Sequence, residues 1–471
     1  MSQIGQVRIC VDLRFIPMRY EDAINILCRI RLFGTKLGLA NTRYLLEALG
    51  HPERRYAVVH VAGTNGKGTV ASLVAGALGA AGHTVGLFTS PHISSFRERM
   101  QVNGELVTEA AVVERLERLL PIIEEMGERD DVTLPTFFEV VTAMAADVFA
   151  ARGCDVAVFE VGLGGRLDAT NALGATVSAI TSIGVDHTAW LGESLWEIAA
   201  EKAGIIKPGV PVVTDTLAPE AREVVRRTAA EREAPLVEVG RDIVVEERMP
   251  DREGQTLTVR TAQGTYDTVR VALHGAHQAG NCAVALGVIE ALAYAGVDVS
   301  REAIFTGFCE ARWPGRFEVV PGDPAFILDA AANASAAEAL RATLDEFLAD
   351  DERLLLVIGV LKDKAYGRMC RALVQRADEV IVTEPQSKRA LWAEEFFYTA
   401  ERYALGRPVR VVARLDEALA AGQARMRERK GFVLVTGSIF MLAQARELLG
   451  VAEAAQDFRL TEVLAAPTGK R

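Results

Sequence analysis

A short apolar strand that runs into a glycine-rich turn and then a helix is the feature that most constrains this chain. Residues 56–62 are rich in β-branched side chains, as expected of a parallel strand buried on both faces. Gly63, Gly66 and Gly68 allow the turn to bring its N–H groups close to an anion. The helix predicted over residues 69–81 directs its positive end at the same place. These residues predict an α/β fold with a phosphate site at the turn.

Two side chains of the turn add to this prediction. Lys67 supplies a full charge for β- and γ-phosphates, and the Thr69 hydroxyl is placed to ligate Mg²⁺. The usual loop, GxxxxGK[ST], has its hydroxyl residue directly after the lysine, whereas Gly68 intervenes here. An ordinary tight strand–helix connection is the alternative to a nucleotide site. The predicted nucleotide-binding loop comprises Gly63, Thr64, Asn65, Gly66, Lys67, Gly68 and Thr69.

Length and composition limit the architecture and the partners. With 471 residues the chain exceeds what one hydrophobic core usually supports, so two domains are expected. No apolar run approaches the roughly 18 residues needed to cross a bilayer, and no signal-peptide core is visible. A net charge of −11 argues against a nucleic-acid surface. We therefore expect a soluble, cytoplasmic protein that contacts neither membrane nor nucleic acid.

The six cysteines are scattered along the chain without CxxC pairs. Most stand among apolar neighbours. They are expected to be buried reduced thiols rather than disulfides or zinc ligands.

Polar side chains stand at the ends of three further predicted strands: Ser90 after residues 83–89, Glu160 in residues 155–161, and His187 after residues 176–184. Ligands of doubly wound folds bind at the carboxyl edge of the sheet. A carboxylate such as Glu160, followed by a Gly-Gly turn, is well placed to hold Mg²⁺ near phosphates. The alternatives are a helix cap for Ser90, a surface carboxylate for Glu160 and a structural role for His187.

Two predicted helices carry further candidates. Residues 136–151 include Phe137 and Phe138, which fit either a core stripe or an aromatic face for stacking. Lys202 lies near the end of the helix predicted over residues 194–204, where a solvated charge would be ordinary.

A domain junction is predicted at residues 312–316, Arg-Trp-Pro-Gly-Arg, because proline and glycine separate an apolar helix from a new strand. Residues 241–273 alternate like β-ribbons, and a second α/β alternation of strands and helices begins at Phe317. We therefore predict two domains, residues 1–311 and 312–471. The second is expected to hold a smaller, mostly parallel, Rossmann-like sheet.

Several strings are similar to those of one family. They are GTKLGLANTRYLLEALG (residues 34–50), GTNGKGT (63–69), EVGLGGRLDATN (160–171), DHTAWLG (186–192), EKAGIIKPG (201–209) and RWPGRFE (312–318). Over residues 20–450 the chain resembles the Mur-ligase superfamily, in particular folylpolyglutamate synthases and dihydrofolate synthases. This resemblance implies a Mur-ligase-like P-loop ATPase domain with a parallel sheet, followed by the Rossmann-like domain.

The resemblance also implies roles for individual residues. Metal ligands would be Thr69, Ser90, Glu160, His187 and Lys202, the last as a carbamate. Catalytic residues would be Lys67, His187 and Lys202. Further nucleotide contacts would be Asn281, Arg316 and Asp329. The pterin site would be lined by Thr136, Phe137, Phe138, Glu139, Leu167, Asp168 and Ala169. Asn281 and Arg316 could equally be an ordinary polar helix residue and a salt-bridge arginine.

One string departs from the family. Where the family has Asp-Gly-Ala-His-Asn, this chain has Asp329, Ala330, Ala331, Ala332 and Asn333. Whatever the histidine contributes to nucleotide or amino-acid binding is therefore absent at Ala332. The departure is compatible with weaker activity, a shifted second substrate or an altered copy of the enzyme.

The expected activity is an ATP-dependent ligation of L-glutamate to a pteroyl or folyl carboxylate through an acyl phosphate. Expected cofactors are ATP and two Mg²⁺ ions, with a monovalent cation as a further candidate, and a monomer is expected. Dihydrofolate synthase, folylpolyglutamate synthase and both together remain open, and both together is favoured. Alternatives are a Mur-type ligase with other substrates, against which the short segment before the loop argues, and a P-loop ATPase that ligates nothing. The latter would have a standard GK[ST] loop and a guanine-reading motif, neither of which is found.

Overall fold

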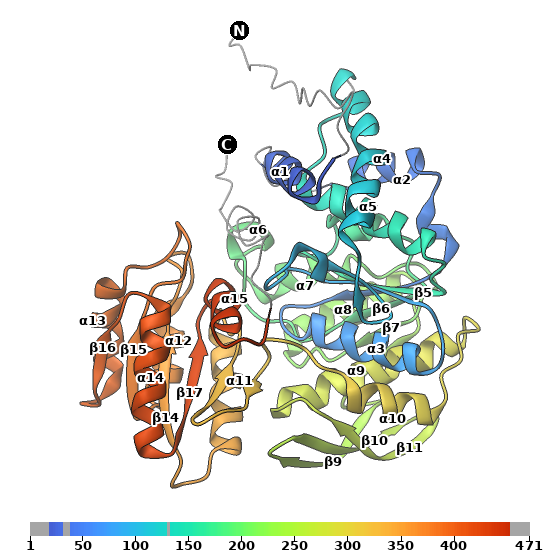
Figure 1. Cartoon of the computed structure of the whole chain (residues 1–471). Helices are drawn as coiled ribbons and strands as arrows, with labels where there is room; N and C mark the ends of the chain where they lie inside the picture. The colour runs from blue at the N-terminus through green and yellow to red at the C-terminus, as the bar shows by residue number, and fades with distance from the viewer. Residues whose placement is uncertain (1–17, 32–37, 130–131, 453–471) are drawn as a thin grey trace.

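A computed structural model of the chain describes residues 18–31, 38–129 and 132–452. It contains three sheets, of eight, three and six strands (Figure 1). Residues 34–37 of the family-like string and the thiol of Cys10 lie outside the described residues. We refer to residues 312–452 as the C-terminal part.

The eight-stranded sheet holds the predicted glycine-rich turn at its centre. Its order is β4-β3-β2-β5-β1-β6-β7-β8, and it is parallel from β2 to β8. The two edge strands β3 and β4 are antiparallel. The bounds are β1 Ala57–Ala62, β2 Val85–Phe88, β3 Met100–Val102, β4 Glu105–Leu106, β5 Val156–Glu160, β6 Val177–Ile180, β7 Val212–Thr214 and β8 Leu236–Glu238. The parallel α/β sheet predicted from the buried strands is confirmed.

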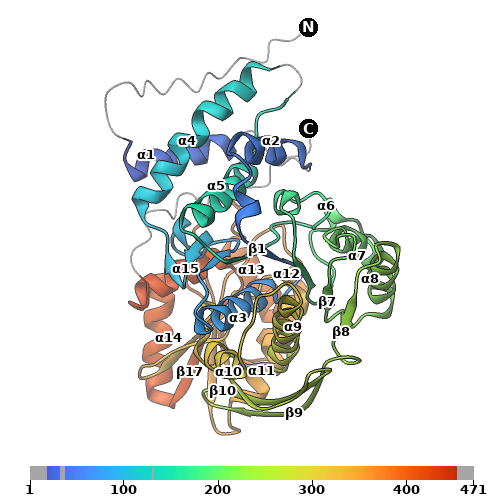
Figure 2. The ribbon, with the colours of Figure 1, turned by 90° about the vertical axis from the view of Figure 1, so that its right-hand side faces the viewer.

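Alternate residues of the central strands enter different cores. Val58 and Phe159 belong to a core with helices α1, α2, α4 and α5, whereas Val59 and Val158 pack with α3, α9 and α10. Figures 1 and 2 both show α3 and α9 side by side along the sheet. The helices are α1 Tyr20–Arg31, α2 Ala40–Ala48, α3 Lys67–Ala80, α4 Glu109–Glu128, α5 Phe137–Ala151, α6 Thr188–Leu191, α7 Leu195–Ala203, α8 Pro219–Glu231, α9 Ala276–Ala293 and α10 Arg301–Glu310. Because successive side chains of a strand point to opposite faces of the sheet, the alternation of Val58 with Val59 shows that the central strands are buried on both faces.

The predicted ribbons form a separate antiparallel sheet, β9 Val244–Asp251, β10 Gly254–Thr261 and β11 Gly264–Val271. This sheet packs on α9 and α10 and also contacts the C-terminal part. Arg248 Nη1 donates to Glu346 Oε1 at 2.6 Å, and the Arg252 guanidinium lies 4.5 Å from the centre of the Phe347 ring. The ribbons therefore connect the two parts of the molecule on the side away from the glycine-rich turn.

The six-stranded sheet of the C-terminal part has the order β12-β13-β17-β14-β15-β16. Only β12 is antiparallel, so the predicted Rossmann-like, mostly parallel sheet is confirmed. Its elements are β12 Glu318–Val320, β13 Ala325–Leu328, α11 Ala334–Phe347, β14 Arg353–Ile358, α12 Tyr366–Val374, β15 Glu379–Val382, α13 Ala393–Ala404, β16 Val409–Val411, α14 Leu415–Arg429, β17 Gly431–Thr436 and α15 Ile439–Leu448. The exact domain boundary at residue 312 stays a prediction.

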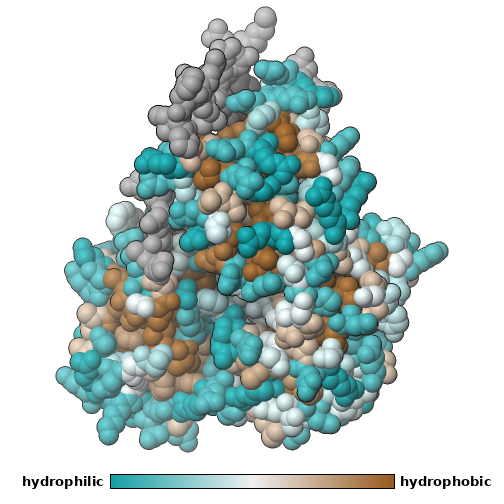
Figure 3. Space-filling view, turned by 45° about the vertical axis from the view of Figure 1, so that its right-hand side comes forward, coloured by the Kyte–Doolittle hydropathy of each residue, from teal (hydrophilic) through white to brown (hydrophobic). Residues whose placement is uncertain are grey.

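The face of the molecule in Figure 3 mixes hydrophilic residues with smaller hydrophobic areas. Within the described ranges, every helix is too short or too polar to cross a membrane. The five described cysteines are free. Cys154, Cys282 and Cys370 are buried as predicted for most of them, but Cys309 is exposed.

Helix α3, which follows the glycine-rich turn, is held by a close backbone contact with α10. A Cβ added at Gly76 would lie 2.9 Å from the Gly307 carbonyl oxygen, and one added at Gly307 would collide with the backbone of Ala77. We expect Gly307→Leu to lower the free energy of unfolding by about 3 kcal/mol, because the helices must separate to admit the side chain.

Thermal denaturation of the full chain measures this effect. Gly79→Ala, in the partner helix α3, is the control, since no atom outside its own helix turn lies within 4 Å of the added Cβ. It should raise the stability by about 0.5 kcal/mol through the lower backbone entropy of alanine. An unchanged midpoint in Gly307→Leu would show that the helix contact is not tight.

Candidate active site

A cavity of about 1150 Å³ lies between the carboxyl edge of the eight-stranded sheet and the C-terminal part. The glycine-rich turn, the residues after β2, β5, β6 and β7, the first turns of α9 and the start of α11 all line it. This volume is sufficient for a nucleotide together with a second ligand. The predicted site residues other than Gly63 and Lys202 lie on its wall.

The predicted phosphate loop is fixed in place by hydrogen bonds with the segment that follows β6. Thr181 Oγ1 donates to the Asn65 carbonyl oxygen at 2.6 Å, and Thr64 Oγ1 donates to that of Gly184 at 3.0 Å. Gly66 has a φ of 87°, and a Cβ there would collide with Oδ1 of Asn281. The loop therefore requires glycine at this position for both conformation and space.

The extra glycine of the loop has a packing reason. Helix α3 begins at Lys67, two residues before the predicted start at Thr69, so Gly68 lies in its first turn. The indole ring of Trp313, from the predicted junction, lies directly against Gly68, where any Cβ would meet it. The departure from the GK[ST] pattern thus allows the C-terminal junction to pack on the loop.

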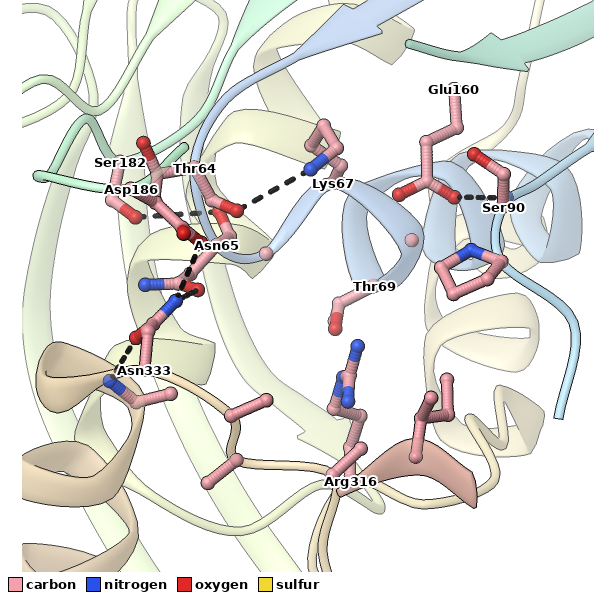
Figure 4. Close-up of a pocket in the computed structure, with 18 of the residues that line it drawn as sticks. Thr64, Asn65, Lys67, Thr69, Ser90, Glu160, Ser182, Asp186, Arg316 and Asn333 are labelled. Atoms are coloured by element: carbon pink, nitrogen blue, oxygen red, sulfur yellow. Dashed lines mark hydrogen bonds between the residues drawn. The ribbon is translucent and has the colours of Figure 1, made fainter. Parts of the chain in front are cut away.

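Ser90 and Glu160, the predicted metal ligands from neighbouring strands, meet at the edge of the sheet. The Ser90 N–H donates to Glu160 Oε2 at 2.9 Å (Figure 4). Burial raises the pKa of Glu160, while Lys67, the Ser90 N–H and Arg316 lower it. A carboxylate in this position is an oxygen ligand facing the loop, and so fits Mg²⁺.

His187 reaches the same cavity from the loop after β6. It stands before α6 with a φ of 50°, and its side chain is half exposed. Burial lowers its pKa, an effect opposed by Asp186 and reinforced by Lys364, so the imidazole is neutral at pH 7 and able to bind a metal. The described residues hold no group of three or more His, Cys, Asp or Glu side chains at metal-binding distances. The fit therefore depends on Glu160 with the Ser90 and Thr69 hydroxyls.

Lys202 is buried beneath the loop, not solvated. Its Nζ donates to the Gly63 carbonyl oxygen at 2.8 Å. Burial, together with the charge of Lys67, lowers the pKa of Lys202 to about 7, and Asp186 and Asp168 oppose this shift. A large fraction of the amine is therefore unprotonated at neutral pH.

The predicted pterin residues line the same cavity, and several also have structural roles. Thr136 and Glu139 form a capping box at the start of α5, with the Thr136 N–H 2.6 Å from Glu139 Oε2. Asp168 is buried, accepts from the Leu163 N–H at 2.8 Å and from the Thr170 hydroxyl at 2.5 Å, and so shapes its own loop. Phe137, Phe138, Leu167 and Ala169 are on the same wall.

The predicted nucleotide contacts of the C-terminal part also face the loop. Figure 4 shows the Arg316 side chain pointing toward Thr69. Asp329 is largely committed to the backbone, since it accepts from the N–H groups of Phe317 and Ala331, both at 2.8 Å. Ala332 lines the cavity with a methyl group where the family pattern has histidine.

A polar network across the cavity mouth was not predicted. Asn333 Nδ2 donates to Asn65 Oδ1 at 3.2 Å and to Asp186 Oδ2 at 3.1 Å, and Asn65 Nδ2 donates to Ser335 Oγ at 3.0 Å (Figure 4). Lys364 Nζ lies 3.8 Å from Asp186 Oδ1. These contacts tie the phosphate loop to the C-terminal part. The sequence features that could have indicated this network are the Asp-His pair at residues 186–187 and the string VLKDK at residues 360–364.

The fold and the site define a ligase of the Mur type. The family model described as "Mur ligase middle domain" matches residues 61–289, and that described as "Mur ligase, glutamate ligase domain" matches residues 315–439.

Named relatives narrow this class. The dihydrofolate synthase/folylpolyglutamate synthase of Bacillus subtilis is 35% identical over 437 residues, which cover 91% of this chain and 99% of that protein. A probable bifunctional folylpolyglutamate synthase/dihydropteroate synthase of Halobacterium salinarum is 39% identical over 431 residues, 91% of this chain but 51% of that protein. A crystal structure of Mycobacterium tuberculosis folylpolyglutamate synthase complexed with ADP and AMPPCP has a TM-score of 0.85 and 32% identity, covering 92% of this chain and 99% of that chain.

This chain belongs to the folylpolyglutamate synthase/dihydrofolate synthase family of Mur ligases. The membership confirms the family resemblance, the Mur-ligase-like fold and the enzyme class predicted from the sequence, an ATP-dependent acid–amino-acid ligase. The roles of individual site residues stay predictions.

The lowered pKa of Lys202 predicts a specific pH dependence of stability. The pKa of Lys202 is about 7 in the folded protein, against an ordinary value of 10.5, so between these pH values the unfolded chain binds one more proton. The stability of the wild type relative to Lys202→Met should therefore rise as the pH increases from about 7 toward 10.5.

Urea denaturation in CO₂-free buffer at several pH values measures this difference. Lys430→Met, at an exposed helix end, is the control and should follow the wild type at every pH. Parallel profiles for Lys202→Met and the wild type would contradict a depressed pKa at Lys202.

Proposed function

We propose that this protein adds L-glutamate to dihydropteroate and to reduced folyl-polyglutamates, with ATP converted to ADP and phosphate. The observation that carries the proposal is one continuous cavity that is lined both by the phosphate loop and by Phe138, Leu167 and Ala169. An aromatic and apolar wall suits a pteridine ring, and the distance to the loop is bridged by the rest of the substrate.

The first step joins the substrate carboxylate to the γ-phosphorus of ATP. A carboxylate oxygen attacks phosphorus, the bond to ADP breaks, and an acyl phosphate forms. Lys67 and the N–H groups of the loop stabilise the negative charge of the transferring group, and Arg316 approaches it from the C-terminal part. In the second step the glutamate amine attacks the acyl carbon, phosphate leaves with the bonding electrons, and the amine loses a proton.

We assign Mg²⁺ to the wall formed by Thr69, Ser90 and Glu160, with His187 as a further ligand. Two hydroxyls and a buried carboxylate are ligands of the kind that Mg²⁺ accepts. The metal would supply charge neutralisation of the phosphates. The number of ions and any monovalent cation stay predictions, as do the cytoplasmic location and the monomeric state.

Lys202 is proposed to be carbamylated. A buried amine whose pKa is near 7 is nucleophilic at neutral pH and can attack CO₂, losing a proton to give a carbamate anion. The carbamate would place an anionic oxygen, able to bind a metal ion, where the buried amine now lies beside the loop. Intact-mass measurement under native conditions should show one added carboxyl group that is lost in acid and absent in Lys202→Met.

The alternative substrates are a different carboxylate or amino acid, as in other Mur-type ligases. A nucleotide-binding protein that ligates nothing is disfavoured by the size of the cavity beyond the loop and by the C-terminal part facing it.

ADP release with MgATP and L-glutamate tests the proposal. Each assay adds either dihydropteroate or a reduced folate. Turnover that requires both glutamate and a pteridine is expected, with activity toward both pteridines. ATP hydrolysis that ignores the pteridine would rule the proposed ligation out, and activity with one pteridine alone would reduce the assignment to a single synthase.

Restoring histidine at Ala332 should improve the enzyme. The side chain would enter the cavity beside Asn333, so we expect Ala332→His to raise kcat/KM for ATP or glutamate by about tenfold, the effect of one added hydrogen bond to a charged group. Ala332→Phe fills similar space without a donor and is the control. Equal behaviour of the two variants in the same assay would show that the histidine has no binding role in this chain.

A further inference from the structure

One carboxylate of the cavity has no part in the chemistry above. Asp215 directly follows β7 and lines the same cavity as the phosphate loop. Its carboxylate lies against the Cα of Gly280 in α9, and a Cβ added at Gly280 would collide with Asp215 Oδ2. The glycine at position 280 therefore leaves the space that the carboxylate occupies beside the helix.

The Asp215 carboxylate is an acceptor without a donor. Its side chain makes no hydrogen bond within residues 18–31, 38–129 and 132–452. Arg222, the nearby charge, donates instead to the carbonyl oxygens of Thr216 at 2.9 Å and Leu217 at 3.1 Å. Burial raises the pKa of Asp215 to about 6, against the effect of Arg222, so the group is mostly ionised at neutral pH. A half-buried anion of this kind favours a ligand that offers an N–H group.

The position of Asp215 relative to the loop suits the base of a nucleotide. Asn281 packs against Gly66 of the loop, while its neighbour Gly280 packs against Asp215. A nucleotide with its phosphates in the loop therefore runs along the first turns of α9 toward the carboxylate. The same cavity has apolar side chains on the flanking elements, suited to the faces of a planar ring: Leu217, Val245, Ala339 and Leu340.

We propose that Asp215 accepts a hydrogen bond from the exocyclic amino group of the purine base, and so makes the protein select a 6-aminopurine triphosphate over a 6-oxopurine. A 6-oxo group would set an acceptor against an acceptor, which a carboxylate cannot relieve by donating. This specificity role rests on the proposed use of ATP at the loop and concerns only the base end of the nucleotide.

Calorimetric titration of the full chain with Mg²⁺ and three nucleotides tests the proposal. The nucleotides are ATP, ITP and purine riboside 5′-triphosphate, which lacks only the 6-amino group. The wild type should bind ATP about tenfold more tightly than purine riboside triphosphate, the contribution of one hydrogen bond to a charged group. Asp215→Ala should bind these two equally, while its affinity for purine riboside triphosphate stays within about twofold of the wild type.

Two further variants separate recognition from folding. Asp215→Asn keeps the shape of the side chain and can donate to a 6-oxo group, so it should bind ITP more tightly than the wild type does. Glu220→Gln, an exposed carboxylate in α8 outside the cavity, should leave all three affinities unchanged.

An ATP preference that is the same in the wild type, Asp215→Ala and Asp215→Asn would overturn the proposal, as would an equal weakening of all three nucleotides. Binding is measured without a pteridine, so the result is independent of the ligase assay. A protein with the expected preferences and no pteridine-dependent turnover would retain this inference and lose the proposed function. A protein with pteridine-dependent turnover and no effect of the Asp215 variants on nucleotide preference would retain the proposed function and lose this inference.

Discussion

The parallel alignment of the central strands is the constraint on which the site depends. Because β2, β5, β1, β6 and β7 run in one direction at a spacing of about 4.8 Å, the residues that follow them meet at one edge. Ser90, Glu160, Asp186 and Asp215 are far apart in the chain and come together only for this reason. The phosphate loop, the proposed metal ligands and Asp215 thus lie together because they belong to one sheet.

Small residues then allow other elements to approach that edge. Gly68 admits the ring of Trp313, Gly66 admits Asn281, and Gly280 admits Asp215. Each contact brings a group from a different segment to within van der Waals distance of the loop or of α9. The unusual sequence of the loop is therefore explained by the side chains that pack against its glycines, and not by phosphate binding alone.

The features that could be predicted from the sequence are those determined by neighbouring residues. The strand before the loop, the strand-terminal residues Ser90 and Glu160 and the second α/β alternation were all recognisable, because burial and turn chemistry leave a pattern in neighbouring residues. Family strings supplied the ligase class.

Contacts between distant segments were not predictable in the same way. Asn333 and Asp186 are 147 residues apart, and each is an ordinary polar residue in its own segment. The family resemblance implied a substrate contact for Glu139 and did not reveal its capping hydrogen bond. Asp215 could not be singled out from the sequence, because a single aspartate after a strand is common. That its carboxylate accepts no hydrogen bond from the described residues can be recognised only from the three-dimensional structure.

The hydrogen bonds between Asn65 and the pair Asn333 and Ser335 have a thermodynamic consequence. Asn65 belongs to the predicted nucleotide loop and also contacts the C-terminal part, so nucleotide binding in the loop and contact between the two parts would be linked equilibria. By reciprocity, if a bound nucleotide favours the closed arrangement by some factor, closure tightens nucleotide binding by that same factor. Under the proposed use of ATP, release of ADP would then be coupled to separation of the two parts through these few amide contacts.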